Sequence, residues 1–191
     1  GDMKAILQIS HGMVEYIDRY DAFASFLTEH GYYVVGHDHL GHGQSVQTEE
    51  DHGFFAHPNG NECVIGDIHR LRGMVQKKYP DTPYFMLGHS MGSFLIRQYM
   101  EMHGKGLDGV IVMGTGSQPG AVLAVGKTIC KTLAAFKGWR HRSDFVDNMA
   151  FASYLVAIVP IILIYIFDRI TFSLLIRSRS SQVYDNSMWK S

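Results

Sequence analysis

The stretch Tyr84-Phe85-Met86-Leu87-Gly88-His89-Ser90-Met91-Gly92 decides the fold class of this chain. Its first four residues form an apolar run that favours a buried strand, and residues 91–103 have helical spacing. Between them lies a Gly-x-Ser-x-Gly sequence. In such a strand-to-helix turn the serine has a strained backbone and its hydroxyl stands exposed above the sheet. Ser90 is therefore predicted to be a nucleophile, and the alternative is an ordinary serine in a glycine-rich turn.

Strands and helices alternate along the first 113 residues. The expected strands are Ala5–Ile9, Tyr32–Val35, Tyr84–Leu87 and Val110–Met113, and the expected helices are Arg19–His30, 62–79 and Met91–His103. The strands are apolar throughout rather than at every second residue, which is typical of strands buried on both faces. The sequence therefore predicts an α/β fold, a mostly parallel sheet with helices on both faces.

Residues 120–138 predict an amphipathic helix outside this sheet. Its apolar face is formed by Val122, Val125, Ile129, Leu133 and Phe136. Lys127, Lys131 and Lys137 lie elsewhere on the helix. Two interpretations remain open, a lid over an apolar substrate and a helix that lies on the core.

The overall charge excludes one class of partner. The chain carries 17 basic and 18 acidic side chains, a formal net charge of -1, which offers no footprint for nucleic acid phosphates. Cys63 and Cys130 are too few for a disulfide framework. Gly1-Asp2-Met3 does not begin a signal peptide pattern, so we expect a cytoplasmic location or one peripheral to a membrane.

Residues 149–167 differ in composition from the rest of the chain. They read MAFASYLVAIVPIILIYIF and contain neither a charged residue nor a histidine. A helix of this many residues is about long enough to span a bilayer. Pro160 would kink such a helix. Two interpretations of the apolar tail 149–191 remain open. Met149–Phe167 is a membrane contact, or the tail is a non-native junction.

Stabilising the oxyanion of ester hydrolysis requires backbone amides next to the nucleophile. One amide usually comes from the residue after the serine, here Met91, and the other from the loop after an earlier strand. His11-Gly12-Met13 directly follows the strand Ala5–Ile9, so the Met13 amide is the second candidate. The alternative for His11-Gly12 is a plain turn that ends a strand.

Three motifs carry a resemblance to a known family. They are His11-Gly12-Met13-Val14-Glu15 followed by Arg19-Tyr20, then His37-Asp38-His39-Leu40-Gly41-His42-Gly43-Gln44-Ser45, and finally Gly88-His89-Ser90-Met91-Gly92. With them the chain resembles the α/β-hydrolases of the monoacylglycerol lipase and lysophospholipase type, which are grouped with the serine aminopeptidase-like hydrolases. The resemblance extends to Asn148, and the chain departs from the family pattern after about Ser153.

The resemblance implies a partial α/β-hydrolase fold and a serine esterase acting on a monoacylglycerol or a lysophospholipid-like ester. It implies the nucleophile Ser90, the Met13 and Met91 amides as oxyanion donors, and neither a metal nor another cofactor. It also implies substrate-binding residues, which are His11, Gly12 and His89. The residues expected to fasten the neighbouring loop are Asp38, Gly41, His42, Gly43 and Ser45.

A triad also needs a histidine and an acid, in the order serine, acid, histidine for this fold. After Ser90 the only histidines are His103 and His141. The one usable order is Ser90, Asp108, His141, but Asp108 precedes its strand and His141 lies in a basic loop. No triad acid or histidine is therefore identified, and esters should be hydrolysed weakly or not at all unless a second chain supplies the base.

These observations predict a hydrolase fragment that lacks the opening strands and the C-terminal acid and histidine. Its expected parts are a hydrolase core, 1–118, the beginning of a cap, 119–148, and the apolar tail, 149–191. Two other functions remain open. One is a non-catalytic or membrane-anchored hydrolase-like module, and the other is a metal-dependent hydrolase that uses His37, His39 and His42. The oligomeric state is not predicted.

Overall fold

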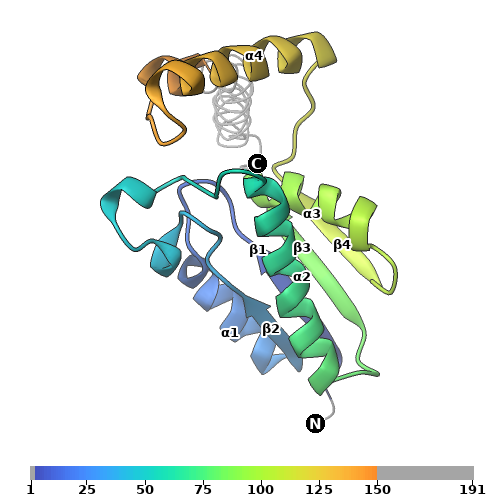
Figure 1. Ribbon diagram of the computed structural model, residues 1–191. Helices are drawn as coiled ribbons and strands as arrows, with labels where there is room; N and C mark the ends of the chain where they lie inside the picture. The colour runs from blue at the N-terminus through green and yellow to red at the C-terminus, as the bar shows by residue number, and fades with distance from the viewer. Residues whose placement is uncertain (1–2, 150–191) are drawn as a thin grey trace, which may run out of the picture. The chain divides into compact units, whose positions relative to one another are not determined.

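The computed structural model describes residues 3–149 of the chain. The chain divides into two compact units, Gly1–Arg140 and His141–Ser191. All elements considered below belong to the first unit (Figure 1). The boundaries expected near residues 118 and 148 stay predictions.

Four parallel strands form the sheet, in the order β2-β1-β3-β4. They are β1 (Ala5–Ser10), β2 (Tyr32–Gly36), β3 (Tyr84–His89) and β4 (Gly109–Met113). In the register of the two central strands, Ser10 lies beside Gly88. Because all strands are parallel, the loops that follow β1, β2 and β3 emerge at one edge of the sheet. The predicted α/β class is confirmed.

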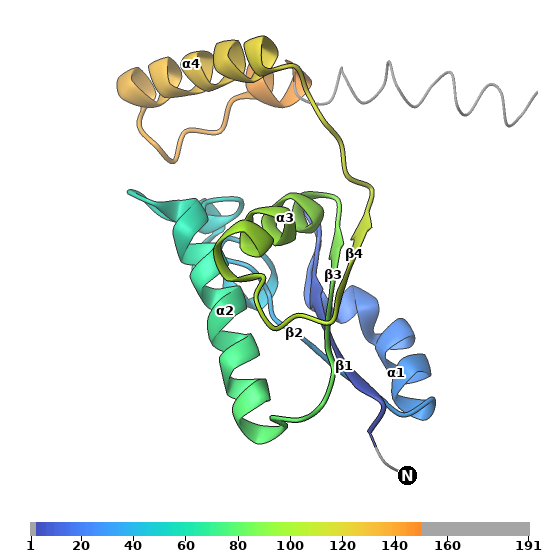
Figure 2. The same ribbon diagram turned by 90° about the vertical axis from the view of Figure 1, so that its right-hand side faces the viewer.

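Helices cover both faces of the sheet, as Figure 2 shows. Helix α1 (Asp21–Glu29), which follows a 3-10 turn at Ile17–Tyr20, packs against β2 on one face. Helices α2 (Gly60–Lys78) and α3 (Met91–His103) lie on the other face and pack against each other. Short 3-10 turns at Gly43–Ser45 and Glu49–Asp51 lie in the long connection between β2 and α2.

The main core lies between the sheet and the helices α2 and α3. Its buried side chains are Ile6, Val64, Ile65, Ile68, Val75, Tyr84, Met86, Leu95 and Tyr99. A polar bridge crosses it, because the Tyr84 hydroxyl donates to Gln8 Oε1 at 2.5 Å and Gln8 Nε2 donates to Ile68 O at 3.0 Å. This bridge satisfies a buried amide side chain, which would otherwise destabilise the core.

Strand β4 differs from the sequence expectation. Its apolar run predicted burial, yet Ile111, Val112 and Met113 are 46%, 38% and 47% exposed. Within residues 3–149, β4 pairs only with β3. An apolar run indicates that a strand is suited to burial, but it does not show whether neighbouring elements cover it.

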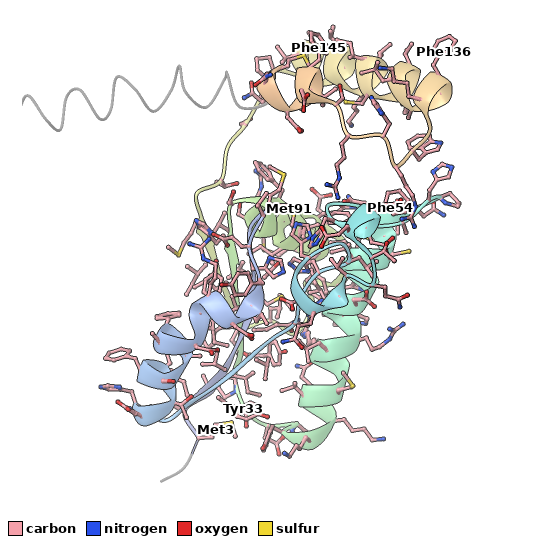
Figure 3. All side chains as sticks on the ribbon, turned by 90° about the vertical axis from the view of Figure 1, so that its left-hand side faces the viewer. Met3, Tyr33, Phe54, Met91, Phe136 and Phe145 are labelled. Atoms are coloured by element: carbon pink, nitrogen blue, oxygen red, sulfur yellow. The ribbon has the colours of Figure 1, made fainter. Side chains whose placement is uncertain are left out.

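Helix α4 (Gly120–Lys137) forms where the amphipathic pattern predicted a helix, and none of its residues is buried. The residues after it contact the loop between β2 and α2. The Trp139 ring stacks on His57 with centroids 4.2 Å apart. Arg140 pairs with Asp51 and lies 4.5 Å from the centroid of the Phe54 ring. Figure 3 labels Phe54 on this loop and Phe136 on α4.

Between residues 3 and 149, no helix has both the length and the apolar character needed to cross a membrane. The expected membrane contact at Met149–Phe167 lies outside the described residues, apart from Met149 itself.

Candidate active site

Ser90 lies at the turn between β3 and α3, in a left-handed backbone conformation with φ 52° and ψ −117°. A residue other than glycine pays roughly 1–3 kcal/mol for such a conformation, so the surroundings must hold it in place. The Ser90 amide donates to Met113 O at 2.9 Å. The Ser90 carbonyl accepts from the Ser93 amide at 2.9 Å and from Ser93 Oγ at 2.5 Å. The turn is therefore fixed from both sides.

Two glycines permit the close approach of α3 to the sheet. A Cβ at Gly92 would lie 2.0 Å from Ser10 O and 2.7 Å from His11 O, both backbone atoms. A Cβ at Gly88 would lie 2.5 Å from Gly92 O. The first turn of α3 therefore rests directly on the end of β1. Met91, labelled in Figure 3, is the first residue of this helix.

The loop after β1 borders Ser90. A Cβ at Gly12 would lie 3.2 Å from Ser90 Cβ, so no side chain separates the loop from the serine. Among residues 3–149, the Met13 and Met91 amides have no hydrogen-bond acceptor. Two N–H groups from the two segments beside Ser90 thus remain available to an oxygen atom of a ligand.

Asp38 fastens the loop after β2. Its Oδ1 accepts from the Ile17 amide and its Oδ2 from the Gln44 amide, each at 2.7 Å. Ser45 Oγ donates to Asp38 O at 2.7 Å. The Asp38 carboxylate therefore joins the two ends of this loop through Gln44, and joins the loop to the 3-10 turn before α1 through Ile17.

Two glycines in this loop have positive φ. Gly41 has φ 72°, and a Cβ there would lie 2.7 Å from the backbone N and O of Phe54. Gly43 has φ 49°, and a Cβ there would lie 2.2 Å from Asp38 Oδ2. Both positions combine a backbone that favours glycine with a lack of space.

The expected substrate contact of His11 does not fit the structure. Its imidazole is fully buried, its Nε2 accepts from the His39 amide at 3.0 Å, and its Nδ1 lies 2.8 Å from Gly12 O. This pattern fits a neutral ring with its proton on Nδ1. His11 therefore ties the two loops together, and it contacts no solvent from which a substrate could approach.

Burial also governs the neighbouring histidines. It lowers the pKa of His39 to about 2, aided by the nearby His11, His37 and His42, and His39 Nε2 bonds Ser10 Oγ at 2.9 Å. Burial lowers the pKa of His11 and His37 as well. His42 is buried, with Nδ1 3.0 Å from Leu40 O. Burial therefore disfavours the protonated form of the His11, His37 and His39 imidazoles beside the site.

These histidines do not converge on a metal position. The rings of His37 and His39 meet edge to face with centroids 5.1 Å apart, and His39 Nε2 is occupied by Ser10. Residues 3–149 include no group of three or more histidine, cysteine or carboxylate side chains placed to hold a metal ion. No observation of the described residues favours the metal-dependent alternative.

Glu15 is a site residue that the sequence analysis did not single out. Its Oε2 accepts from the Gly12 amide at 2.8 Å and from the Tyr20 hydroxyl at 3.0 Å, and lies 3.3 Å from His89 Nδ1. Burial alone would raise the pKa of this carboxyl, but the hydrogen bonds from Gly12, His89 and Tyr20 together lower it. Burial and the bond to Glu15 raise the pKa of Tyr20 to about 12.

The substitute triad of Ser90, Asp108 and His141 gains no support. Asp108 directly precedes β4, and its Oδ2 accepts from the Tyr84 amide at 2.7 Å, at the start of β3. This is the opposite end of the sheet from Ser90. His103 stacks on His69 at the far end of α3, with centroids 4.0 Å apart. His141 belongs to the second unit.

The profile of the serine aminopeptidase S33 family of hydrolases matches residues 1–153. The chain belongs to this family. The mouse protein "Monoglyceride lipase" is 39% identical over 92 residues, which are 48% of this chain and 28% of that protein. Two solved structures are also similar, and both support the assignment.

A structure of a thermostable carboxyl esterase from Bacillus coagulans superimposes with a TM-score of 0.64 and 35% identity, covering 71% of this chain and 43% of that one. A structure described as an open form of a lipase superimposes with a TM-score of 0.72 and 27% identity, covering 81% of this chain and 50% of that one. This S33 chain thus spans half or less of the length of these relatives.

Proposed function

We propose that this S33 family member is a serine hydrolase that cleaves esters of single-chain lipids such as monoacylglycerols or lysophospholipids. The observation that carries the proposal is the strained turn at Ser90, against which the Gly12 backbone of the loop after β1 lies closely. The names of the relatives, a monoglyceride lipase and a carboxyl esterase, support an ester as substrate.

In the proposed reaction, Ser90 Oγ attacks the carbonyl carbon of the ester. The carbonyl oxygen becomes an oxyanion and accepts hydrogen bonds from the Met13 and Met91 N–H groups. When the tetrahedral intermediate collapses, the bond to the alcohol breaks and the alcohol leaves with the proton that the Ser90 hydroxyl has lost, while the acyl group remains on Ser90 Oγ. Water then releases the fatty acid.

In this proposal Ser90 is the nucleophile and the Met13 and Met91 amides are the oxyanion donors, but within residues 3–149 no histidine ring is hydrogen-bonded to the Ser90 hydroxyl that it would have to deprotonate. When a triad member is removed, oxyanion donors and binding retain about 10³–10⁴ of rate over water. We therefore expect the 191-residue chain to be acylated slowly, and to hold the acyl group because deacylation is slow as well.

Helix α4 is the proposed lid for the lipid chain. Its exposed apolar side chains include Val122, Leu123 and Val125, which are 55%, 47% and 61% exposed. The segment before α4 is held by hydrogen bonds from Arg97 to Thr115 and Gly116. The segment after α4 is held by the stacking of Trp139 on His57. An apolar helix held at both ends is suited to shelter an acyl chain.

Acyl transfer tests this function. After incubation with the p-nitrophenyl ester of a fatty acid, intact mass spectrometry should show one acyl group per chain, located on Ser90. A 1-monoacylglycerol should slow this acylation several-fold by competing for the site, whereas free glycerol should not.

The control is Ser117→Ala, which changes an exposed serine in the loop after β4 and should keep the adduct. Ser90→Ala should abolish it. An adduct that persists in Ser90→Ala would refute Ser90 as the nucleophile. Acylation that monoacylglycerol leaves unchanged would refute the proposed substrate class.

A further inference from the structure

The turn that carries the Met13 amide is strained. Val14 has φ 57°, and together with Asn59 and Ser90 it is one of three residues other than glycine with positive φ within residues 3–149. Valine is β-branched, so it is poorly suited to the left-handed region. Its side chain is 82% exposed and therefore has little packing to hold it there. Another contact must keep the turn in this conformation.

The Glu15 carboxylate provides that contact. The Glu15 side chain is only 14% exposed, and its Oε2 accepts the Gly12 amide at 2.8 Å across the turn. The same oxygen lies 3.3 Å from His89 Nδ1, on the residue directly before Ser90. A single carboxylate oxygen thus joins the loop after β1, which carries the Met13 amide, to the end of β3, two residues before Met91.

Two further groups hold the carboxylate itself. The Tyr20 hydroxyl donates to Oε2 at 3.0 Å, and Arg19 Nη1 lies 3.7 Å from Oε1. The Gly12 amide is not available to an oxyanion because it donates to Glu15. The next amide along the chain, that of Met13, remains available. Charge-assisted hydrogen bonds of this kind are roughly twice as strong as neutral ones.

We propose that Glu15 is a positioning residue, which holds the strained Gly12–Val14 turn so that the Met13 amide faces the Ser90 hydroxyl. The proposal rests on the proposed function for its effect on reactivity, but the clamp itself is a structural claim. Glu15 does not touch the reacting atoms. It acts through the amide that it orients and through His89.

The test compares Glu15→Gln with Glu29→Gln, which removes an equal charge from an exposed position on α1. The readouts are the rate of Ser90 phosphonylation by an alkyl fluorophosphonate and the hydrogen exchange of the Gly12 amide, which donates to Glu15 Oε2. Glu15→Gln should slow phosphonylation at least tenfold and speed exchange of the Gly12 amide at least tenfold, without changing exchange in the sheet. Glu29→Gln should leave both rates unchanged.

A rescue separates positioning from general structural support. Glycine adopts positive φ without strain, so Val14→Gly should make the turn less dependent on the carboxylate. The loss of reactivity caused by Glu15→Gln should be at least threefold smaller in the Val14→Gly background. Equal losses in both backgrounds would overturn the proposal.

The outcomes also separate this inference from the proposed function. If the parent chain is phosphonylated and Glu15→Gln reacts equally fast, the positioning role is wrong while the serine hydrolase stands. If the parent chain is not phosphonylated, the proposed function fails for this chain and the exchange of the Gly12 amide decides alone. Unchanged Gly12 exchange in Glu15→Gln would then overturn the clamp, and faster Gly12 exchange without faster exchange in the sheet would support it.

Discussion

Gly92→Ala is expected to destabilise the folded protein by about 3 kcal/mol or more, because the added methyl has no space. The new Cβ would lie 2.0 Å from Ser10 O, and the atoms that it meets belong to the backbone rather than to a flexible side chain. Relief requires α3 to move away from β1, which would dismantle the turn at Ser90. A loss of this size is a large part of the roughly 5–15 kcal/mol that stabilises a typical domain.

The matched control is Gly73→Ala in the exposed face of α2. A Cβ there meets no atom within 4 Å, so the same substitution should raise the free energy of unfolding by roughly 0.5–1 kcal/mol through helix propensity. Urea unfolding followed by circular dichroism measures both variants. If Gly92→Ala unfolds within 0.5 kcal/mol or so of the parent protein, the close contact between α3 and β1 is wrong.

Acid should destabilise the protein between pH 6.5 and pH 5, through the buried histidines beneath the site. Burial holds the pKa of His39 at about 2, below its ordinary value of 6.5, so the unfolded chain binds more protons than the folded one in this range. The stabilisation is complete above pH 6.5 and is lost as the pH falls. One imidazole that stays neutral contributes a loss of about 2 kcal/mol at pH 5.

His11 and His37 act in the same direction, since burial lowers their pKa values too. Urea unfolding at a series of pH values should show a free energy that falls from pH 7 to pH 5. His39→Gln should flatten this slope by up to about 1.4 kcal/mol per pH unit. A free energy independent of pH in the parent protein would contradict the buried neutral histidines.

The elements around Ser90 could be predicted because their signals are local. Helix α3 begins and ends where its spacing predicted, at Met91 and His103, whereas β3 runs two residues beyond the predicted Leu87, to His89. The parallel sheet followed from the alternation of strands and helices, but the order of the strands in it was not predicted. The exposure of β4 could not be predicted, because an apolar sequence does not reveal which elements surround a strand.

The roles of single side chains in the site were less predictable. The family resemblance implied a substrate contact for His11, but its ring turns inward to the loop after β2, bonding an amide 28 residues away. The contact between Glu15 and His89 joins residues 74 positions apart. Such contacts depend on how two loops meet at the sheet edge, and spacing along the chain carries no signal for them.

Mapping the adduct of an alkyl fluorophosphonate by peptide mass spectrometry tests the nucleophile most directly. Oxyanion amides should make Ser90 react faster than any solvent-exposed serine, even without an efficient base. The account predicts a slow but single modification, located on Ser90, and none on the same peptide of Ser90→Ala. Modification spread over exposed serines such as Ser117, with Ser90 unmodified, would contradict it.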